Sequence, residues 1–177
     1  MKKKIGTVWL GGCSGCHMSL LDIDERILDV VALADIVKSP IVDGKEFPDV
    51  DVAIVEGAVI TDEHLREARH IREHSKILIS LGDCAVTANV PSFRNRITKE
   101  EALQCAYVDA PSNDSGKIPN SPQLGKLLDR VRPLHEVVKV DYYLPGCPPS
   151  ADLIFYVLAE LLNGRMPALD KEKLKYG

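Results

Sequence analysis

The sequence has 177 residues, of which 45% are hydrophobic and 27% are charged, and its formal net charge is −4 at pH 7. This composition is typical of a globular domain and excludes a disordered chain or a disulfide-stapled mini-protein. The acidic balance excludes a nucleic-acid partner, because it provides no basic field for a phosphate backbone. The longest strongly apolar run, residues 153–159, is far shorter than the roughly 20 residues of a membrane-spanning helix.

The start of the sequence predicts a cytoplasmic location. Lys2, Lys3 and Lys4 look like the basic start of a signal peptide, but no long apolar region, twin arginine or cleavage site follows them. We therefore expect a cytoplasmic protein that does not span a membrane and forms one domain over residues 1–177. Cysteines stay reduced in that compartment, so the five cysteines indicate metal or redox chemistry rather than disulfides.

Short apolar runs rich in β-branched residues alternate with helix-like stretches along the chain. The runs are residues 5–10, 34–37, 50–55, 76–81 and 137–144. Strands that alternate with helices predict an α/β fold with a parallel, doubly wound sheet of five strands.

Three helices are expected between these strands. Residues 20–31 repeat apolar side chains at the spacing of one helix face. A second helix should begin after Thr61 as N-cap and bury Leu65, Ala68 and Ile71. A third should run over residues 150–162, before an Asn-Gly pair. Residues 91–122 are weakly periodic, and we expect them to form a long excursion that is functional or binds a partner.

Four of the five cysteines follow predicted strands. Cys13 and Cys16 come after the first strand, Cys84 after the fourth and Cys147 after the fifth, each with a glycine within the two preceding positions. The carboxyl ends of parallel strands share one edge of the sheet, so these thiols should meet there. Glycine amides and helix N-termini at this edge should stabilise thiolates. Cys105 follows no such turn, and we expect it to be a buried small hydrophobe.

Four thiolates in a glycine-lined crevice suit a [4Fe–4S] cluster, and the Cys-Pro step after the fifth strand is typical of such sites. A structural zinc site normally has two compact cysteine pairs, whereas this chain has one pair and two distant single cysteines. A thioredoxin-like dithiol would use Cys13 and Cys16 but would leave Cys84 and Cys147 unexplained. Both alternatives remain open at this point.

Three histidine and glutamate features add candidates. Residues 70–74 match the H-x-x-E-H pattern of inverted zinc peptidases, but the helical period turns both histidines toward solvent, which favours a hydrated last turn. Glu56 ends the third strand on the cysteine-bearing edge, where it is either a cap or a surface charge, or a carboxylate that moves protons or accepts a hydrogen bond beside a cluster. His17 directly follows Cys16 and is either a packed or interfacial histidine or a hydrogen-bond donor to a partner or to sulfur.

Four segments together carry a family resemblance. They read GCSGCHMSLLD at residues 12–22, VEGA at 55–58, GDCA at 82–85 and LPGCPP at 144–149. In this order they resemble the small subunit of [NiFe] hydrogenases, in particular the cytoplasmic, bidirectional, NAD-reducing type. The resemblance extends over nearly the whole chain.

The resemblance implies a flavodoxin-like fold with strand order 2-1-3-4-5. It also implies one proximal [4Fe–4S] cluster held by Cys13, Cys16, Cys84 and Cys147. The nickel-iron centre would lie in a separate large subunit, and electrons would pass to diaphorase subunits with FMN and further iron–sulfur clusters that reduce NAD. On this interpretation the chain binds neither H2 nor NAD, and Glu56 and His17 are candidates for tuning the cluster or moving protons.

Two departures from related chains refine this expectation. Many hydrogenase small subunits continue into a cysteine-rich region with further clusters, whereas no cysteine follows Cys147, so one cluster is expected. The related quinone-reducing chain of respiratory complex I typically has adjacent cysteines, whereas Cys13 and Cys16 are separated here. A complex I-like subunit is therefore the second interpretation.

Overall fold

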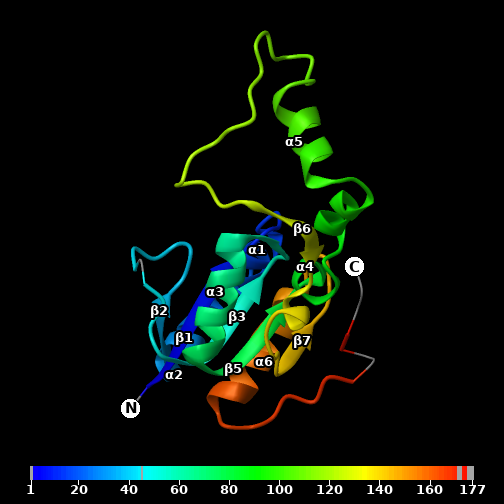
Figure 1. Cartoon of the computed structure of the whole chain (residues 1–177). Helices are drawn as coiled ribbons and strands as arrows, with labels where there is room; N and C mark the ends of the chain where they lie inside the picture. The colour runs from blue at the N-terminus through cyan, green and yellow to red at the C-terminus, as the bar shows by residue number, and fades with distance from the viewer. Residues whose placement is uncertain (1, 45, 171–172, 175–177) are drawn as a thin grey trace.

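The computed structural model describes residues 2–44, 46–170 and 173–174. Its centre is a five-stranded sheet in the order β2-β1-β3-β5-β7, in which all paired strands are parallel (Figure 1). The strands are β1 (Lys3–Trp9), β2 (Ala34–Lys38), β3 (Val50–Glu56), β5 (Ser75–Leu81) and β7 (Tyr142–Leu144). The predicted doubly wound α/β sheet and its strand order are confirmed.

Helices cover both faces of this sheet. On one face Ile5, Ile54 and Ile79 pack beneath α1 (Gly15–Leu21), α2 (Ile27–Leu33) and α6 (Ala151–Leu162). On the other face Val8 and Leu78 belong to a second buried cluster with residues of α3 (Asp62–Glu73). Central strands buried on both faces explain why the sequence shows continuous apolar runs rather than alternation.

The two helices with clear caps form as expected. In α3 the Thr61 hydroxyl accepts a hydrogen bond from the backbone N–H of His64, and Ala68 and Ile71 are buried. In α6 the Ser150 hydroxyl accepts from the backbone N–H of Leu153, at 3.3 Å. Both caps satisfy backbone donors that would otherwise lack a partner at the first turn.

The helix predicted over residues 20–31 is wrong as one continuous element. The chain instead forms α1, a 3-10 turn η1 (Asp24–Arg26) and α2. Asp24 has a φ of 53°, a left-handed conformation that interrupts the helix. Ile23 beside it is only 1% exposed, so the bend places this side chain in the core.

The fifth strand is shorter than predicted, and one strand pair was missed. Only Tyr142–Leu144 of residues 137–144 forms β7, after a 3-10 turn η3 (Leu134–Glu136) with buried Leu134. The missed pair is antiparallel and joins β4 (Val59–Thr61) to β6 (Leu127–Arg132). Its two members are far apart in the sequence, so no local pattern marks the pairing.

The excursion between β5 and β7 is not structureless. It follows α4 (Asp83–Thr87), which packs against β5 and β3, and it contains a 3-10 segment η2 (Val90–Arg96) and α5 (Lys99–Tyr107). Of these, α5 projects away from the sheet (Figure 1). A capping box between Thr98 and Glu101 starts α5, which has no buried residue. Cys105 lies on this helix and is exposed, so its predicted burial is wrong. Because α5 does not pack against the hydrophobic core, its side chains stay accessible to solvent.

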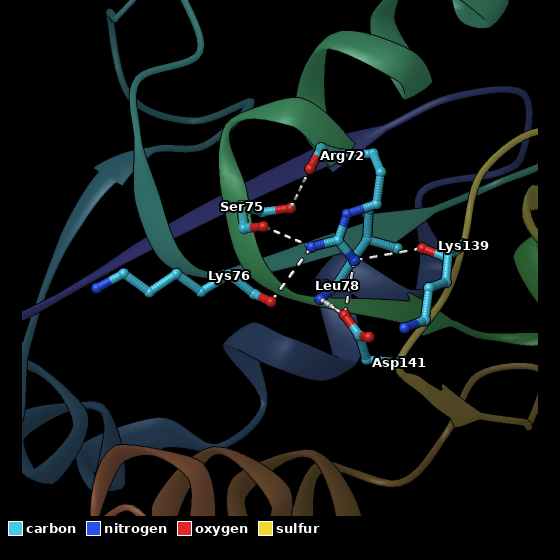
Figure 2. Close-up of polar contacts among 6 residues, drawn as sticks. All are labelled: Arg72, Ser75, Lys76, Leu78, Lys139 and Asp141. Atoms are coloured by element: carbon cyan, nitrogen blue, oxygen red, sulfur yellow. Dashed lines mark hydrogen bonds and ion pairs between the residues drawn. The ribbon is translucent and has the colours of Figure 1, made fainter.

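Arg72 ties the end of α3 to the start of β5 and to the segment before β7 (Figure 2). Its guanidinium donates to a carboxylate oxygen of Asp141 at 2.6 Å and to the backbone carbonyls of Ser75, Lys76 and Lys139. The same carboxylate oxygen accepts from the backbone N–H of Leu78 at 2.8 Å. Burial raises the pKa of Asp141, but the hydrogen bonds from Arg72 and Leu78 outweigh it and lower that pKa overall.

We expect Arg72→Met to lower the free energy of unfolding by about 2–3 kcal/mol, because it removes four hydrogen bonds and leaves the Asp141 carboxylate without its cation. Chemical denaturation measures this. The matched control is Arg66→Met on the same helix, since Arg66 forms only an exposed pair with Asp62 and should matter little.

The Arg72 effect should depend on pH. A lowered folded-state pKa for Asp141 contributes stability that is present above the unfolded value of 3.8 and is lost as the pH falls through the lowered pKa. The difference between the native chain and Arg72→Met should therefore shrink below about pH 4. A difference that stays constant down to strongly acid pH would contradict this assignment.

Candidate metal centre

Four cysteines lie at the carboxyl edge of the parallel sheet. Cys13 follows β1, and Cys16 is in the first turn of α1. Cys84 is in the first turn of α4, directly after β5, and Cys147 follows β7. Cys16 is buried, Cys84 is half-buried, and Cys13 and Cys147 are exposed. The topology thus brings three separate parts of the sequence to one edge, as expected for parallel strands.

Backbone hydrogen bonds lock the Cys84 loop to the Cys147 loop. Gly82 N–H donates to the Leu144 carbonyl at 2.8 Å, and Asp83 N–H donates to the Gly146 carbonyl at 2.9 Å. In return Gly146 N–H donates to the Asp83 carboxylate at 2.7 Å. These bonds extend the β5–β7 pairing beyond the strand ends, so the two loops leave the sheet as one unit.

The first cysteine loop is held by the segment that follows β3. Gly11 and Ala58 exchange two backbone hydrogen bonds of 2.8 and 2.9 Å. Gly57 between them has a φ of +88°, and a Cβ there would come within 3.0 Å of the Gly11 backbone. Ser19 on α1 donates its hydroxyl to the Pro149 carbonyl, which joins this helix to the Cys147 loop. Hydrogen bonds therefore hold the cysteine-bearing loops to one another.

Mutual proximity and burial shift the thiol titrations. Burial first, and then the charges of Cys13, Cys147 and Glu56, raise the pKa of Cys84 to about 11. Burial, Glu56 and the other three cysteines also raise the pKa of Cys16. Desolvation and neighbouring negative charges therefore favour the protonated thiols of Cys16 and Cys84. Metal binding displaces thiol protons, so a bound cluster would offset this effect.

Glycines next to the cysteines leave space for the sulfur atoms, because a side chain at these positions would crowd them. A Cβ at Gly82 would lie 2.2 Å from the sulfur of Cys16, and a Cβ at Gly15 would lie 3.3 Å from the sulfur of Cys13. In the described part of the chain no three His, Cys, Asp or Glu side chains are arranged to hold a single metal ion. Four thiols around a glycine-lined cradle are the donor set of an iron–sulfur cluster, and these residues fit such a group.

His17 and Glu56 form a buried pair beside these thiols. The Glu56 carboxylate oxygen Oε2 lies 2.8 Å from the backbone nitrogen of His17 and 2.5 Å from Nδ1 of its ring. Both residues are at most 2% exposed, and the rings of Trp9 and His17 meet in a T-shaped contact with centroids 5.5 Å apart. One carboxylate therefore fixes both the ring of His17 and the backbone next to Cys16. Glu56 is not a surface charge.

The H-x-x-E-H segment lies away from the cysteines. His70 and Glu73 are exposed, and His74 caps the end of α3, where its Nδ1 lies 2.7 Å from Asp49. The histidine rings contact each other with centroids 4.3 Å apart. This agrees with a hydrated last helical turn.

Two positions with a structural role at the site were not singled out from the sequence. These are Ser19 and Asp83, whose side chains join the cysteine loops. Asp83 directly follows Gly82, and Ser19 lies on α1 three residues after Cys16. No local sequence pattern indicates that either side chain makes a long-range contact.

Comparison with known proteins places the chain in a family. Residues 13–161 match the family model described as NADH ubiquinone oxidoreductase, 20 Kd subunit, and this range includes all four cysteines of the edge. The chain belongs to this family. The range also covers most of the sheet and the excursion, so the match concerns the whole fold rather than one motif.

Several relatives of the chain are named as hydrogenase subunits. The chain is 41% identical over 168 residues to the NAD-reducing hydrogenase HoxS subunit delta of Cupriavidus necator, covering 93% of this chain and 80% of that protein. It is 45% identical over 168 residues to a subunit of the F420-non-reducing hydrogenase of Methanothermobacter marburgensis, covering 92% of this chain. The chain spans only 54% of the length of that methanogen protein.

A solved structure of a relative has the same fold. A chain in the crystal structure of an NAD+-reducing [NiFe]-hydrogenase in the H2-reduced state superimposes with a TM-score of 0.96 at 39% identity, and the match covers 100% of both chains. The fold is thus that of the hydrogenase small subunits. No helix in the described part of the chain is long and apolar enough to cross a membrane.

Proposed function

We propose that this chain is the electron-transfer small subunit of a cytoplasmic, NAD-reducing [NiFe] hydrogenase. In this proposal residues 1–177 form one iron–sulfur domain that holds a single proximal [4Fe–4S] cluster through Cys13, Cys16, Cys84 and Cys147. The observation that carries the proposal is the convergence of these thiols on one glycine-lined edge, in a chain whose relatives are hydrogenase subunits. A relative in Archaeoglobus profundus, 32% identical over 189 residues, is named an iron–sulfur subunit of a hydrogenase, which supports the iron–sulfur interpretation independently of cysteine spacing.

The proposal assigns each cofactor to one subunit of the complex. A bound cluster supplies one-electron transfer between partner sites. The nickel-iron centre is assigned to a large subunit, and FMN and further iron–sulfur clusters are assigned to diaphorase subunits that reduce NAD. This chain's own residues hold the cluster, shape its surroundings and set the path to its partners. Neither H2 nor NAD is assigned a site on it.

Two surfaces are available for these partners. Exposed Trp9 and Met18 lie beside the cysteine loops, and exposed Phe93 and Tyr107 lie on the excursion. Large apolar side chains at such positions favour protein contacts over solvent. We assign both surfaces to subunit contacts, which would shield the exposed thiols of Cys13 and Cys147 from water.

The identity of the electron acceptor is the most specific part of the proposal. NAD is favoured because the relative that reduces it is matched over 80% of its length and the solved NAD+-reducing enzyme over 100%, whereas the methanogen protein is matched over 54%. The second candidate is a small subunit of the F420-non-reducing type, favoured by the 45% identity to that protein.

Anaerobic purification of the chain with its native partners tests the function. We expect a brown complex with about four irons and four sulfides in this chain, a nickel-containing partner, and H2-dependent reduction of NAD+. Loss of NAD+ reduction with retained H2 oxidation by an artificial acceptor would favour the second candidate. One zinc in a colourless chain would instead indicate a zinc-stabilised module. A quinone-reducing complex without nickel would indicate the complex I-like alternative.

We expect Glu56→Gln to shift the reduction potential of the cluster or to slow H2 oxidation while leaving iron content unchanged. The substitution keeps the shape of the side chain but removes the negative charge that lies next to His17 and near Cys16 and Cys84. Redox titration monitored by electron paramagnetic resonance measures the potential. Glu63→Gln, on the exposed face of α3, is the matched control. Unchanged potential and unchanged rate would remove Glu56 from the site.

A further inference from the structure

A small cavity lies behind the His17–Glu56 pair. It has a volume of about 60 Å³, lies between β1, the first two helices and the segment after β2, and opens to the surface beside exposed Leu21 and Ile41. Most of its wall is aliphatic, contributed by residues such as Ile5, Leu20 and Ile54. The polar side chains on its wall are those of Thr7, His17 and Ser39.

Two of these polar side chains have no partner. His17 is 1% exposed and Thr7 is 2% exposed, and neither Nε2 of His17 nor Oγ1 of Thr7 has a hydrogen-bond partner in the described part of the chain. Nδ1 of His17 is already engaged by Glu56, so Nε2 is the remaining polar atom of the ring. A buried polar atom without a partner destabilises the fold, because it loses its hydrogen bonds to water and gains none in return. Because both atoms belong to residues that line the same cavity, one ligand in the cavity could form hydrogen bonds with both of them.

The chemistry and the size of the cavity select that ligand. A hydroxyl and an imidazole nitrogen each donate or accept one hydrogen bond, and the ligand must match either role in a small volume. Water satisfies both requirements. The volume of about 60 Å³ exceeds the roughly 10–15 Å³ that one water molecule needs. Ser39, whose hydroxyl accepts from the backbone N–H of Ile41 at 3.3 Å, offers a third partner.

We propose that this cavity is a structural hydration site, in which water hydrogen-bonded to Nε2 of His17 and Oγ1 of Thr7 links the Glu56–His17 pair to the Ser39 hydroxyl. The water completes the set of partners around the His17 ring. Because Glu56 also holds the backbone next to Cys16, the site helps to fix the start of α1. This inference does not depend on the proposed electron acceptor or on the cluster.

High-resolution crystallography of the full chain tests the site directly. We expect ordered density within hydrogen-bond distance of both His17 Nε2 and Thr7 Oγ1. In Thr7→Val, which keeps the side-chain shape and removes the hydroxyl, this density should be lost or weakened, whereas Thr7→Ser should retain it. Crystals pressurised with xenon should show no xenon in the native cavity, because only a dry apolar cavity binds it. Xenon or an empty cavity overturns the proposal.

The melting temperature provides an independent readout. Ser80 is the matched control, because its hydroxyl is also buried without a partner in the described residues but does not line this cavity. Removing an unsatisfied hydroxyl is neutral or stabilising, whereas removing a partner of bound water is destabilising. We expect Thr7→Val to lower the melting temperature and Ser80→Ala to leave it unchanged or raise it. A melting temperature that rises in Thr7→Val would show that the hydroxyl has no water partner and would overturn the proposal.

Discussion

Cys84→Ala is expected to abolish the [4Fe–4S] signature of the purified complex and with it all H2-dependent electron transfer to NAD+. Cys84 is one of four thiols at the edge of the sheet, and a cubane cluster needs all four ligands. The half-buried side chain is small, so its truncation should leave the sheet folded. Iron and sulfide analysis with electron paramagnetic resonance measures the loss, and circular dichroism checks the fold.

Cys105→Ala is the matched control for this experiment. Cys105 is exposed on α5, outside the loops that carry the other cysteines, and its replacement should leave about four irons per chain. Full iron content in Cys84→Ala would contradict the assigned ligand set. Loss of iron in Cys105→Ala would show that the ligand set includes a cysteine outside the sheet edge.

The raised thiol pKa values add a pH dependence to cluster assembly. The pKa of Cys84 is about 11 in the metal-free chain, compared with an ordinary value of 9.0. Protons therefore compete with iron at every pH below that value, and reconstitution should become weaker as the pH falls. A raised pKa also means that the thiol contributes stability to the metal-free fold below pH 9.0, which is lost as the pH rises through about 11.

Gly82→Ala is the second substitution with a large expected effect. Gly82 has φ 79° and ψ 161°, a conformation that only glycine adopts readily, and an added Cβ would lie 2.2 Å from the sulfur of Cys16. Backbone strain and the forced displacement of Cys16 should together cost roughly 2–6 kcal/mol of unfolding free energy. The displaced sulfur should also prevent cluster assembly. Denaturation of the metal-free chain and iron analysis measure the two effects separately.

Gly164→Ala separates strain from crowding. Gly164 has a φ of +76°, but a Cβ there meets no atom within 4 Å. This substitution should cost about 1 kcal/mol and leave the iron content unchanged. Equal effects at the two glycines would show that the crowding of Cys16 has no consequence for the site.

The long-range contacts of the site could not be predicted from local sequence patterns. Glu56 and His17 were both candidates from their positions, but their direct pairing was not predicted. It joins residues 39 positions apart, and it depends on how α1 lies over the end of β3. The break at Asp24 was missed for a similar reason, since the apolar spacing of residues 20–31 is compatible with a straight helix and only packing of Ile23 into the core favours the bend.

The sequence by itself determined the α/β class, the alternation of strands and helices, and the position of four cysteines after strand ends, because each depends on residue patterns within a short segment. Only the tertiary structure decided that Cys105 is exposed, that β4 pairs with β6, and that burial raises the pKa of Cys16 and Cys84. These properties depend on desolvation and on contacts between distant segments, whose energies leave no trace in local sequence.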